Sequence, residues 1–305
     1  MSKNFIVVSR QWMYLKKLSV KYSSYVKYEN VVNVHLVQYF GKYCLQQIND
    51  DMIINYFQTK INEEKYSLST LSTIRYVLKS ILEYAQSKYA IKCPNFNFIK
   101  LAKKKSDCKV LTSDQIMLLG KYSFNHFEPI SLAILLSLYG GLRIGEFSGL
   151  KWKDIDFEKE TLKVERTILR IKSNGSKTKL VASIPKTITS KRMIPLPSFI
   201  IPLLKKQDII PENYILSRSN KLYDPRILED SFKRLLKKLN IQSIHFHALR
   251  HTFATRCIEA KVDIKTLSEL LGHSSIEITL KTYVHTSDTL KKESIHHLVS
   301  FMHQD

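Results

Sequence analysis

Residues 247–251 read His-Ala-Leu-Arg-His, and residues 140–146 read Gly-Gly-Leu-Arg-Ile-Gly-Glu. His247 and Arg250 are three residues apart, so on a helix both side chains leave the same face. An arginine guanidinium can hold two phosphate oxygens at once and stays charged at any working pH. Arg143 follows a glycine pair, where we expect a turn that lets the backbone approach a ligand closely. The two stretches together predict a phosphate-binding site.

Three further stretches follow in order along the chain: Pro-Lys-Thr-Ile-Thr-Ser-Lys-Arg at 185–192, Leu-Gly-His-Ser-Ser at 271–275, and Thr-Tyr-Val-His at 282–285. They supply Lys186, His273 and Tyr283. A tyrosine hydroxyl is a poor nucleophile at neutral pH because its pKa is about 10. To attack phosphorus it needs a base, positive charge around the phosphate, and an acid for the leaving oxygen. The chain holds a candidate for each task.

In residue type, order and spacing, these stretches resemble the tyrosine recombinase (phage integrase) family, strongly over residues 111–285 and in outline over the N-terminal third. Tyr283 follows His273 by ten residues, an interval similar to that of phage and conjugative-transposon integrases. Chromosome-dimer resolving relatives usually have one residue fewer there. The resemblance implies that Tyr283 is the nucleophile of a 3′-phosphotyrosine intermediate, and that the catalytic residues are Arg143, Lys186, His247, Arg250, His273 and Tyr283.

The resemblance also implies a task for each of these residues. The arginine pair neutralises charge on the phosphate oxygens, and His247 assists proton transfer at the tyrosine. His273 hydrogen-bonds the scissile phosphate. Lys186 protonates the departing 5′ oxygen, with Lys179 and Lys191 as nearby alternatives in a lysine-rich chain.

Three residues are expected to support the site without touching the DNA. Glu146 and Asp154 match the family pattern, but a carboxylate that faced a phosphate would be repelled. We therefore expect both to orient Arg143 and close the fold. His251 lies one turn after His247 on the same helix face, and we expect it to pack behind the site.

Composition indicates the class of partner. Lys and Arg number 48 against 27 Asp and Glu, a net charge of +21, which favours a polyanion such as nucleic acid or an anionic membrane surface. The longest apolar stretch, 132–142, is far shorter than the ~18–20 residues of a membrane span. The short apolar run at 5–8 does not make a signal peptide. We expect a cytoplasmic protein that binds double-stranded DNA, with no membrane contact.

Neither the cysteines nor the acidic residues indicate a metal or a cofactor. No Cys-x-x-Cys spacing occurs, which fits reduced thiols and argues against a zinc site or a disulfide frame; the four cysteines are Cys44, Cys93, Cys108 and Cys257. No acidic pair or triad has the spacing of a two-metal site. We therefore expect no metal and no cofactor.

The predicted fold class is multidomain, α and α+β. Residues 1–103 form a helical core-type DNA-binding (SAM-like) domain, 104–109 a lysine-rich linker, and 110–305 a mostly helical catalytic domain with a small antiparallel sheet. Interleaved Lys and Tyr in the first domain fit either a solvated helix face or phosphate contacts. The periodicity of apolar residues predicts helices over 5–17, 20–40, 49–58 and 69–90.

Local signals place elements of the second domain. Thr112-Ser-Asp-Gln115 predicts a capping box, and a buried helix follows over 129–139. Strands are predicted over 161–170, 180–184 and 193–196, with a hairpin turn at Asn174-Gly175. After Asp224 the chain reads as helical: Asp224-Pro225 begins one helix, Asp263 caps another, and Gly272 ends it.

The function predicted is a site-specific DNA recombinase that integrates or excises a mobile element. By the resemblance, a tetramer exchanges strands between two DNA sites, helped by DNA-bending or directionality factors. We expect the chain to begin at the core-binding region, without an arm-binding module. The alternatives are a chromosome-dimer resolving recombinase and a type IB topoisomerase; a non-enzymatic DNA-binding regulator would have lost some of the six residues.

An apolar stripe follows Tyr283 and predicts a C-terminal tail that docks on a neighbouring protomer or folds back in cis. Its residues are Leu290, Ile295, Leu298, Val299 and Met302.

Overall fold

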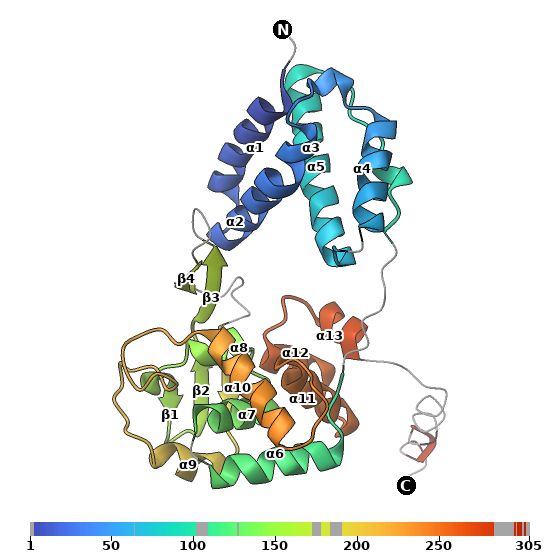
Figure 1. The fold of residues 1–305 in the computed structure, drawn as a ribbon. Helices are drawn as coiled ribbons and strands as arrows, with labels where there is room; N and C mark the ends of the chain where they lie inside the picture. Colours follow the sequence, from blue (N-terminus) through green and yellow to red (C-terminus); the bar gives the residue numbers. More distant parts are fainter. Residues whose placement is uncertain are drawn as a thin grey trace. The chain divides into compact units, whose positions relative to one another are not determined.

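The structure is a computed structural model that describes residues 3–63, 65–101, 109–126, 128–172, 178–183, 191–283, 296, 298–300 and 302 (Figure 1). The chain divides into two compact units. The first comprises residues 1–106 together with 171–177, and the second comprises residues 107–170 and 178–305. Each unit has its own hydrophobic core.

The first unit is helical, with α1 (Phe5–Ser19), α2 (Tyr22–Val31), the π-helical turn η1 (Val32–Leu36), α3 (Val37–Phe40), η2 (Leu45–Gln47), α4 (Asp50–Asn62), α5 (Leu68–Tyr89) and η3 (Phe96–Phe98). Side-chain caps begin the longer helices: Asn49 accepts from the amide of Met52, and Ser67 from that of Thr70. Helix α5 ends at Ala90, which is left-handed at φ 53°. The helices predicted over 49–58 and 69–90 are confirmed within a few residues.

The segment predicted as one helix over 20–40 contains a π turn. A π turn adds one residue to the helical repeat and so rotates the face that follows it. Val32, Leu36 and Phe40 are all buried here. The hydroxyl of Tyr56 donates to the carbonyl of His35 at 3.1 Å.

The second unit combines helices with two small sheets. Its helices are α6 (Ser113–Asn125), α7 (Pro129–Gly140), α8 (Ile144–Ser148), α9 (Ile201–Lys205), α10 (Pro225–Lys238), α11 (His247–Glu259), α12 (Ile264–Leu271) and α13 (Ile276–Tyr283). Its strands are β1 (Ile155–Asp156), β2 (Thr161–Val164), β3 (Thr167–Lys172), β4 (Thr178–Ser183) and β5 (Arg192–Pro195). The predicted fold class is confirmed.

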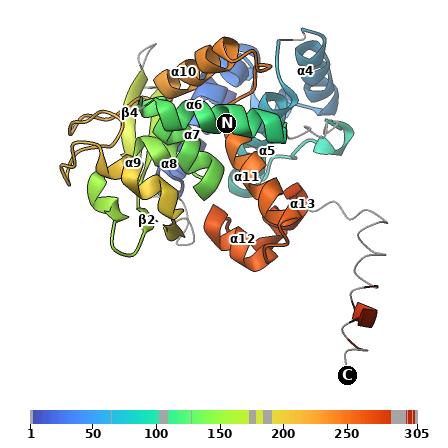
Figure 2. The same cartoon turned by 90° about the horizontal axis from the view of Figure 1, so that it is seen from below.

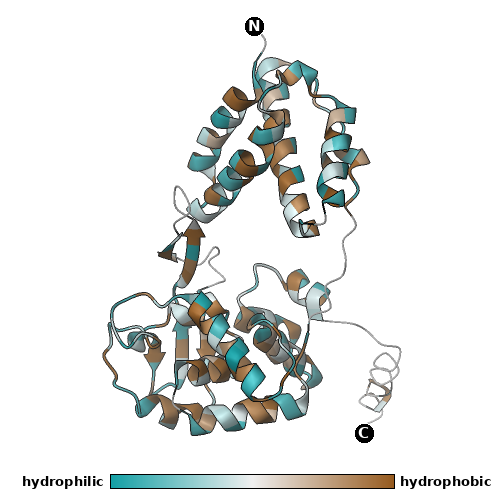
Figure 3. Ribbon diagram, in the orientation of Figure 1, coloured by the Kyte–Doolittle hydropathy of each residue, from teal (hydrophilic) through white to brown (hydrophobic). Residues whose placement is uncertain are grey.

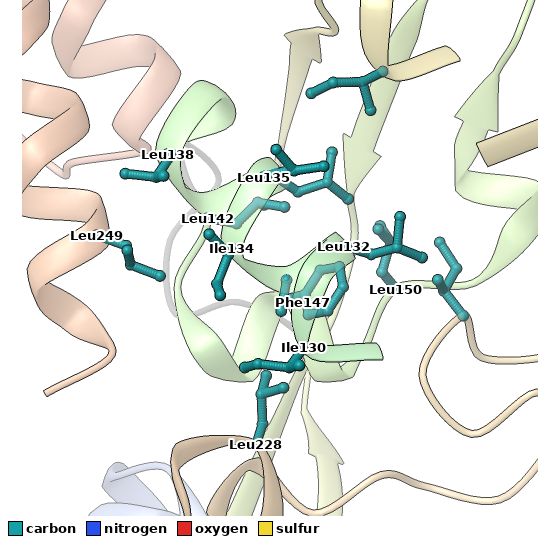
Figure 4. Close-up of a cluster of buried hydrophobic side chains, with 14 of the residues drawn as sticks. Ile130, Leu132, Ile134, Leu135, Leu138, Leu142, Phe147, Leu150, Leu228 and Leu249 are labelled. Atoms are coloured by element: carbon teal, nitrogen blue, oxygen red, sulfur yellow. The ribbon is translucent and has the colours of Figure 1, made fainter. Parts of the chain in front are cut away.

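Helix α7 is the centre of the second core (Figure 4). Almost every residue from Ile130 to Gly140 is buried, with Pro129 in the first turn, where the missing amide costs nothing. Leu228 of α10 and Leu249 of α11 also contribute to this core. The helix stops at Gly141, which is left-handed at φ 63°.

The first sheet has the antiparallel order β1-β2-β5, with Leu162 opposite Ile194 and Ile155 opposite Leu162. The second sheet pairs β3 with β4. The single strand predicted over 161–170 is wrong, because it is split into β2 and β3. Arg166 lies in the break, where its guanidinium pairs with Asp154 and donates to the carbonyl of Gly149 at 3.2 Å. The turn predicted at Asn174-Gly175 lies outside the described residues.

Helices α11, α12 and α13 pack on one another, as both views show (Figures 1 and 2). A small apolar cluster joins them, built on Ala254, Leu267 and Leu271. Asp263 caps α12 through the amide of Thr266, and Gly272 ends that helix at φ 61°. Both predicted helix ends are confirmed.

Hydropathy alternates along the helices that cover the cores. The ribbon of α10, for example, carries both polar and apolar residues along its length (Figure 3), and its buried residues are Leu228, Phe232, Leu235 and Leu236. Within the described residues, no helix combines the length and the hydropathy that crossing a bilayer requires.

The turn after α7 depends on glycine. A Cβ at position 141 would lie 2.6 Å from the ring of Phe253, and the left-handed backbone disfavours any L side chain. We expect Gly141→Ala to lower the free energy of unfolding by at least about 2 kcal/mol. Urea unfolding measures this difference.

Gly120 of α6 is the matched control. A Cβ there meets no heavy atom within 4 Å, and its backbone is helical. Gly120→Ala should stabilise the protein by about 0.5–1 kcal/mol. If both variants have the same stability, the turn at Gly141 does not constrain the fold.

Candidate active site

The end of α7 fixes the position of Arg143. The amide of Gly141 donates to the carbonyl of Ser137 at 3.1 Å, and two residues later Arg143 begins α8 as its N-cap. One terminal nitrogen of Arg143 donates to Oε1 of Glu146 at 2.7 Å, and its backbone amide donates to Oε2 at 3.0 Å. The side chain is still 36% exposed. Arg143 is therefore held by a carboxylate and remains accessible to a ligand.

Arg250 holds two backbone segments together. It lies on α11 and is 1% exposed. Its terminal nitrogens donate to the carbonyl of Gly141 at 2.7 Å and to that of Leu271 at 2.6 Å. Burial, followed by the charge of Arg143, lowers the pKa of Arg250 to about 9, so it stays charged at neutral pH. A guanidinium has five N–H donors, so two carbonyls leave some of them for a phosphate.

The C-terminus of α12 positions His273. The amide of Gly272 donates to the carbonyl of Glu269 at 2.9 Å, and that of His273 to the carbonyl of Ser268 at 3.1 Å. This pair of bonds is the Schellman pattern, which fixes the chain leaving a helix. Nδ1 of His273 lies 2.8 Å from Oγ1 of Thr279, a buried residue of α13. Both the backbone and the ring of His273 are therefore held.

Tyr283 lies at the end of α13 beside two of the predicted histidines. Its ring packs on the apolar cluster of Ala254, Leu267 and Leu271. The ring of His273 is parallel to it, with centroids 6.3 Å apart. The Tyr283 hydroxyl lies 2.8 Å from Nδ1 of His251.

The two histidines of α11 therefore occupy different positions with respect to the tyrosine. His251, expected to pack behind the site, hydrogen-bonds the Tyr283 hydroxyl. His247, expected to assist proton transfer, makes an edge-to-face contact with the ring of His251, with centroids 4.5 Å apart. Of these two described residues, His251 is the one within hydrogen-bonding distance of the hydroxyl.

Glu146 and Arg192 form a buried ion pair behind Arg143. Nη2 of Arg192 lies 2.9 Å from Oε2 of Glu146, and both side chains are about 5% exposed or less. Nε of Arg192 donates to the carbonyl of Leu270 at 2.6 Å. Burial alone would raise the pKa of Glu146, but hydrogen bonds and charge from Arg192, with the charge of Arg143, lower it to about 2. Glu146 is therefore ionised and orients Arg143.

Arg192 was missed by the sequence analysis, although it stands in the stretch quoted for Lys186. It lies 46 residues from Glu146 in the chain and 78 from Leu270. A buried carboxylate requires a cation, but the chain offers 48 Lys and Arg. The alternation in strand β5, where Arg192 is buried and Met193 is exposed, was the available signal.

Asp154 has a different partner from the one expected. It is buried and pairs with Arg166, and Oδ2 also accepts from the amide of Lys151 at 2.8 Å. Arg166 in turn donates to the carbonyl of Gly149. Asp154 therefore closes the turn between α8 and β1, and within the described residues it is Glu146 that contacts Arg143.

Lys186 lies outside the described residues. The alternatives Lys179 of β4 and Lys191, which precedes β5, are both exposed. The choice among the three lysines therefore stays a prediction.

The histidines of the site are uncharged at neutral pH. His247 is exposed to solvent, but the protein atoms around its ring displace part of its water. This desolvation, followed by the charges of His251 and Arg250, lowers the pKa of His247 to about 4. Burial lowers the pKa of His273 to about 4 as well, with further effects of Arg250 and Arg143. Among the described residues of the site, positive charge therefore comes from arginine, and the histidines can accept hydrogen bonds.

This geometry suits transfer of a phosphodiester. Guanidinium groups stabilise charge that builds on equatorial oxygens, and a hydroxyl next to a neutral imidazole can lose its proton. Among the described residues, no three His, Cys, Asp or Glu side chains come together as a metal site.

Comparison with known proteins gives the family. Residues 109–289 match the family described as "Phage integrase family", and residues 5–61 match "Phage integrase, N-terminal SAM-like domain". The chain belongs to the phage integrase family. It is thus a tyrosine recombinase, an enzyme of the class that cleaves and rejoins DNA strands.

Several relatives are similar to this integrase over most of its length. A XerC-like tyrosine recombinase of Caldanaerobacter subterraneus is 29% identical over 93% of this chain and 80% of its own. The transposase of transposon Tn916 from Enterococcus faecalis is 28% identical over 75% of this chain and 61% of its own.

A solved structure shares the fold. It is the Tn1549 transposon integrase in complex with a circular intermediate DNA, with a TM-score of 0.81 and 23% identity. The match covers 97% of this integrase and all of that chain.

Glu146 gives a test of the buried ion pair. Glu146→Gln leaves the guanidinium of Arg192 without its carboxylate, so the free energy of unfolding at pH 7 should fall by about 3 kcal/mol. Glu212, an exposed carboxylate that pairs with Lys153, is the control. Glu212→Gln should change stability little, because exposed pairs are well screened.

The difference in unfolding free energy between the wild type and Glu146→Gln should depend on pH. The folded pKa of Glu146, about 2, is below its unfolded value of about 4.3, so the stabilisation is complete above pH 5 and is lost as the pH falls toward 2. Urea unfolding should show a smaller gap between wild type and Glu146→Gln at pH 3 than at pH 7. An equal gap at both values would show that Glu146 is not ionised in the folded protein.

Proposed function

We propose that this tyrosine recombinase integrates or excises a mobile DNA element. The observation that carries the proposal is the assembly of the Tyr283 hydroxyl, His273 and two arginines at one place in the second unit. Tyr283 attacks a phosphodiester and remains joined to the 3′ phosphate. The 5′ hydroxyl of a partner strand later reverses this bond, so no external energy source is needed.

The other residues of the site have these proposed tasks. Arg143 and Arg250 neutralise the equatorial oxygens of the phosphate, and His273 hydrogen-bonds it. Lys186 protonates the leaving 5′ oxygen, a task suited to an ammonium on a flexible stem. Glu146 holds Arg143 from behind, as its two hydrogen bonds to that residue indicate.

Similarity to mobile-element proteins favours a recombinase that acts on a mobile element over one that resolves chromosome dimers. The relatives include a transposase of Tn916, and the integrase of Tn1549 shares the fold. The interval of ten residues between His273 and Tyr283 favours the same choice. The XerC-like relative keeps a chromosome-dimer resolving recombinase as the second candidate. A type IB topoisomerase shares the chemistry but needs no partner site.

The proposal extends to the domains and partners. Residues 1–103 bind the core DNA site, 104–109 form the linker, and 110–305 carry out catalysis. A net charge of +21 suits a double-stranded DNA partner in the cytoplasm. A tetramer assembles on two DNA sites, as the lambda integrase does on a Holliday junction in a solved structure, and accessory DNA-bending or directionality factors can act on it.

The C-terminal tail is the proposed assembly element. Leu298, Val299 and Met302 are 50%, 48% and 70% exposed, so these apolar side chains are available to a neighbouring protomer. Leu290 and Ile295, predicted to belong to the same stripe, lie outside the described residues.

The covalent step is tested by Tyr283→Phe. Phenylalanine keeps the ring on its apolar cluster and removes only the nucleophilic oxygen. We expect DNA binding to persist and the covalent protein–DNA adduct to vanish on denaturing gels. Tyr139→Phe is the control, because that exposed tyrosine of α7 packs on Phe199 and should leave adduct formation unchanged. Undiminished adducts from Tyr283→Phe would refute the assignment.

The tail is tested by deleting residues 288–305. The truncated protein should still bind a half-site as a monomer and form the adduct, because Tyr283 is retained. It should assemble two-site complexes at least about tenfold less efficiently in gel-shift titrations, since the exposed apolar side chains are gone. Normal assembly would mean that the tail packs in cis.

A further inference from the structure

His251 is placed to take part in the chemistry, although its position in the sequence suggested packing. Its Nδ1 lies 2.8 Å from the Tyr283 hydroxyl, within hydrogen-bonding distance. The two rings are tilted by 54° with centroids 5.5 Å apart, so the nitrogen and the oxygen meet at the ring edges. Residues on α11 and α13, 32 positions apart in the chain, make this contact.

The ring of His251 can act as an acceptor. Burial, followed by the charge of Arg250, lowers its pKa from the ordinary value, so the ring is neutral at neutral pH. In a neutral imidazole one nitrogen carries the proton and the other accepts. With the proton on Nε2, Nδ1 accepts from the Tyr283 hydroxyl, which has a proton to give.

His247 is less well placed for the same task. It contacts the ring of His251, not the tyrosine, in the described part of the site. It lies one turn earlier on α11 and keeps contact with solvent. In this arrangement His247 can support His251 through the edge-to-face contact or face the phosphate.

We propose that His251 accepts the proton of the Tyr283 hydroxyl when that oxygen attacks phosphorus. The proposal rests on the proposed function and deepens it. The Oη–P bond forms as the P–O5′ bond breaks, and the hydroxyl proton moves to Nδ1 of His251. The leaving 5′ oxygen takes its proton from the separate acid, proposed as Lys186. In the reverse reaction His251 returns its proton to the phenolate as the tyrosine leaves.

The groups around His251 determine how readily it can take up a proton. On its own helix are His247 and Arg250, and Tyr283 of α13 contacts it; the ring of His273 in turn lies parallel to that of Tyr283. Helix α7, which also packs on α11, has no charged residue within 129–140. Among the described residues, Arg250 is the charged group that disfavours an imidazolium at His251, and an incoming phosphate would offset its charge.

The test is the pH dependence of single-turnover adduct formation on a nicked DNA substrate that traps the covalent product. For the wild type, the rate should change little between pH 7 and pH 9, because His251 is already neutral. For His251→Ala, the rate at pH 7 should fall by about 10²–10⁴. It should then rise about tenfold per pH unit, because the phenolate must form in water with a pKa of about 10. Added imidazole should restore part of the rate.

Matched variants separate this task from the others. His247→Ala should keep the flat wild-type profile and gain nothing from imidazole. A substrate with sulfur at the 5′ bridging position needs no acid, so it should rescue Lys186→Ala but not His251→Ala. His251→Asn keeps a hydrogen-bonding group of similar size but cannot take a proton, so it should behave as His251→Ala does and should fold even if the alanine variant does not.

The outcomes are distinct. The proposal is overturned if His251→Asn has a flat pH profile and a rate close to that of the wild type. It is also overturned if His251→Asn forms the adduct faster than the wild type, because the contact would then only restrain the tyrosine. The same holds if imidazole rescues His247→Ala alone. If wild-type protein forms no adduct at any pH, the proposed function itself fails. Thermal melting and DNA binding of each variant show that a lost rate is not a lost fold.

Discussion

Two buried guanidinium groups hold the C-terminus of α12, and the geometry of the site depends on them. Arg192 donates to the carbonyl of Leu270, and Arg250 donates to the carbonyl of Leu271. The last carbonyls of a helix have no partner within the helix and carry partial negative charge, so cations satisfy them well. The same arginines reach Glu146 and the carbonyl of Gly141, near Arg143. One set of bonds therefore fixes Arg143 relative to the loop that carries His273.

The charges of this set do not cancel, and the excess suits a phosphate. Three arginines and one carboxylate, Glu146, leave a surplus of two positive charges. Burying charged groups is unfavourable unless each is hydrogen-bonded, and here carbonyls and the carboxylate provide the bonds. The histidines add no charge at neutral pH because their pKa values are lowered. The negative charge of a phosphodiester would offset this surplus.

Features set by neighbouring residues could be predicted from the sequence, whereas features set by distant partners could not. Asp263 and Gly272 fix the two ends of α12 through bonds within a few residues, and the capping box at Thr112 is equally local. The break in the strand predicted over 161–170 arises from Arg166, whose partner Asp154 lies in an earlier turn. The contact between His251 and Tyr283 joins two helices whose packing no local pattern specifies. With 48 cationic side chains in the chain, the sequence also could not single out Arg192 as the partner of Glu146.

Because Arg250 is buried and Tyr283 lies at a helix end, replacing one or the other should inactivate this protein in different ways. Its guanidinium is nearly inaccessible and ties α7 to α12, so a chain without it loses part of its scaffold together with its chemistry. Tyr283, in contrast, sits at the end of the last described helix of the catalytic core, where its reactive oxygen can be lost without disturbing the ring. A copy defective at the tyrosine would still fold and occupy recombination sites beside intact protomers. In the proposed tetramer such an allele would be dominant, because its product takes the place of an intact protomer, whereas an allele defective at Arg250 would be recessive.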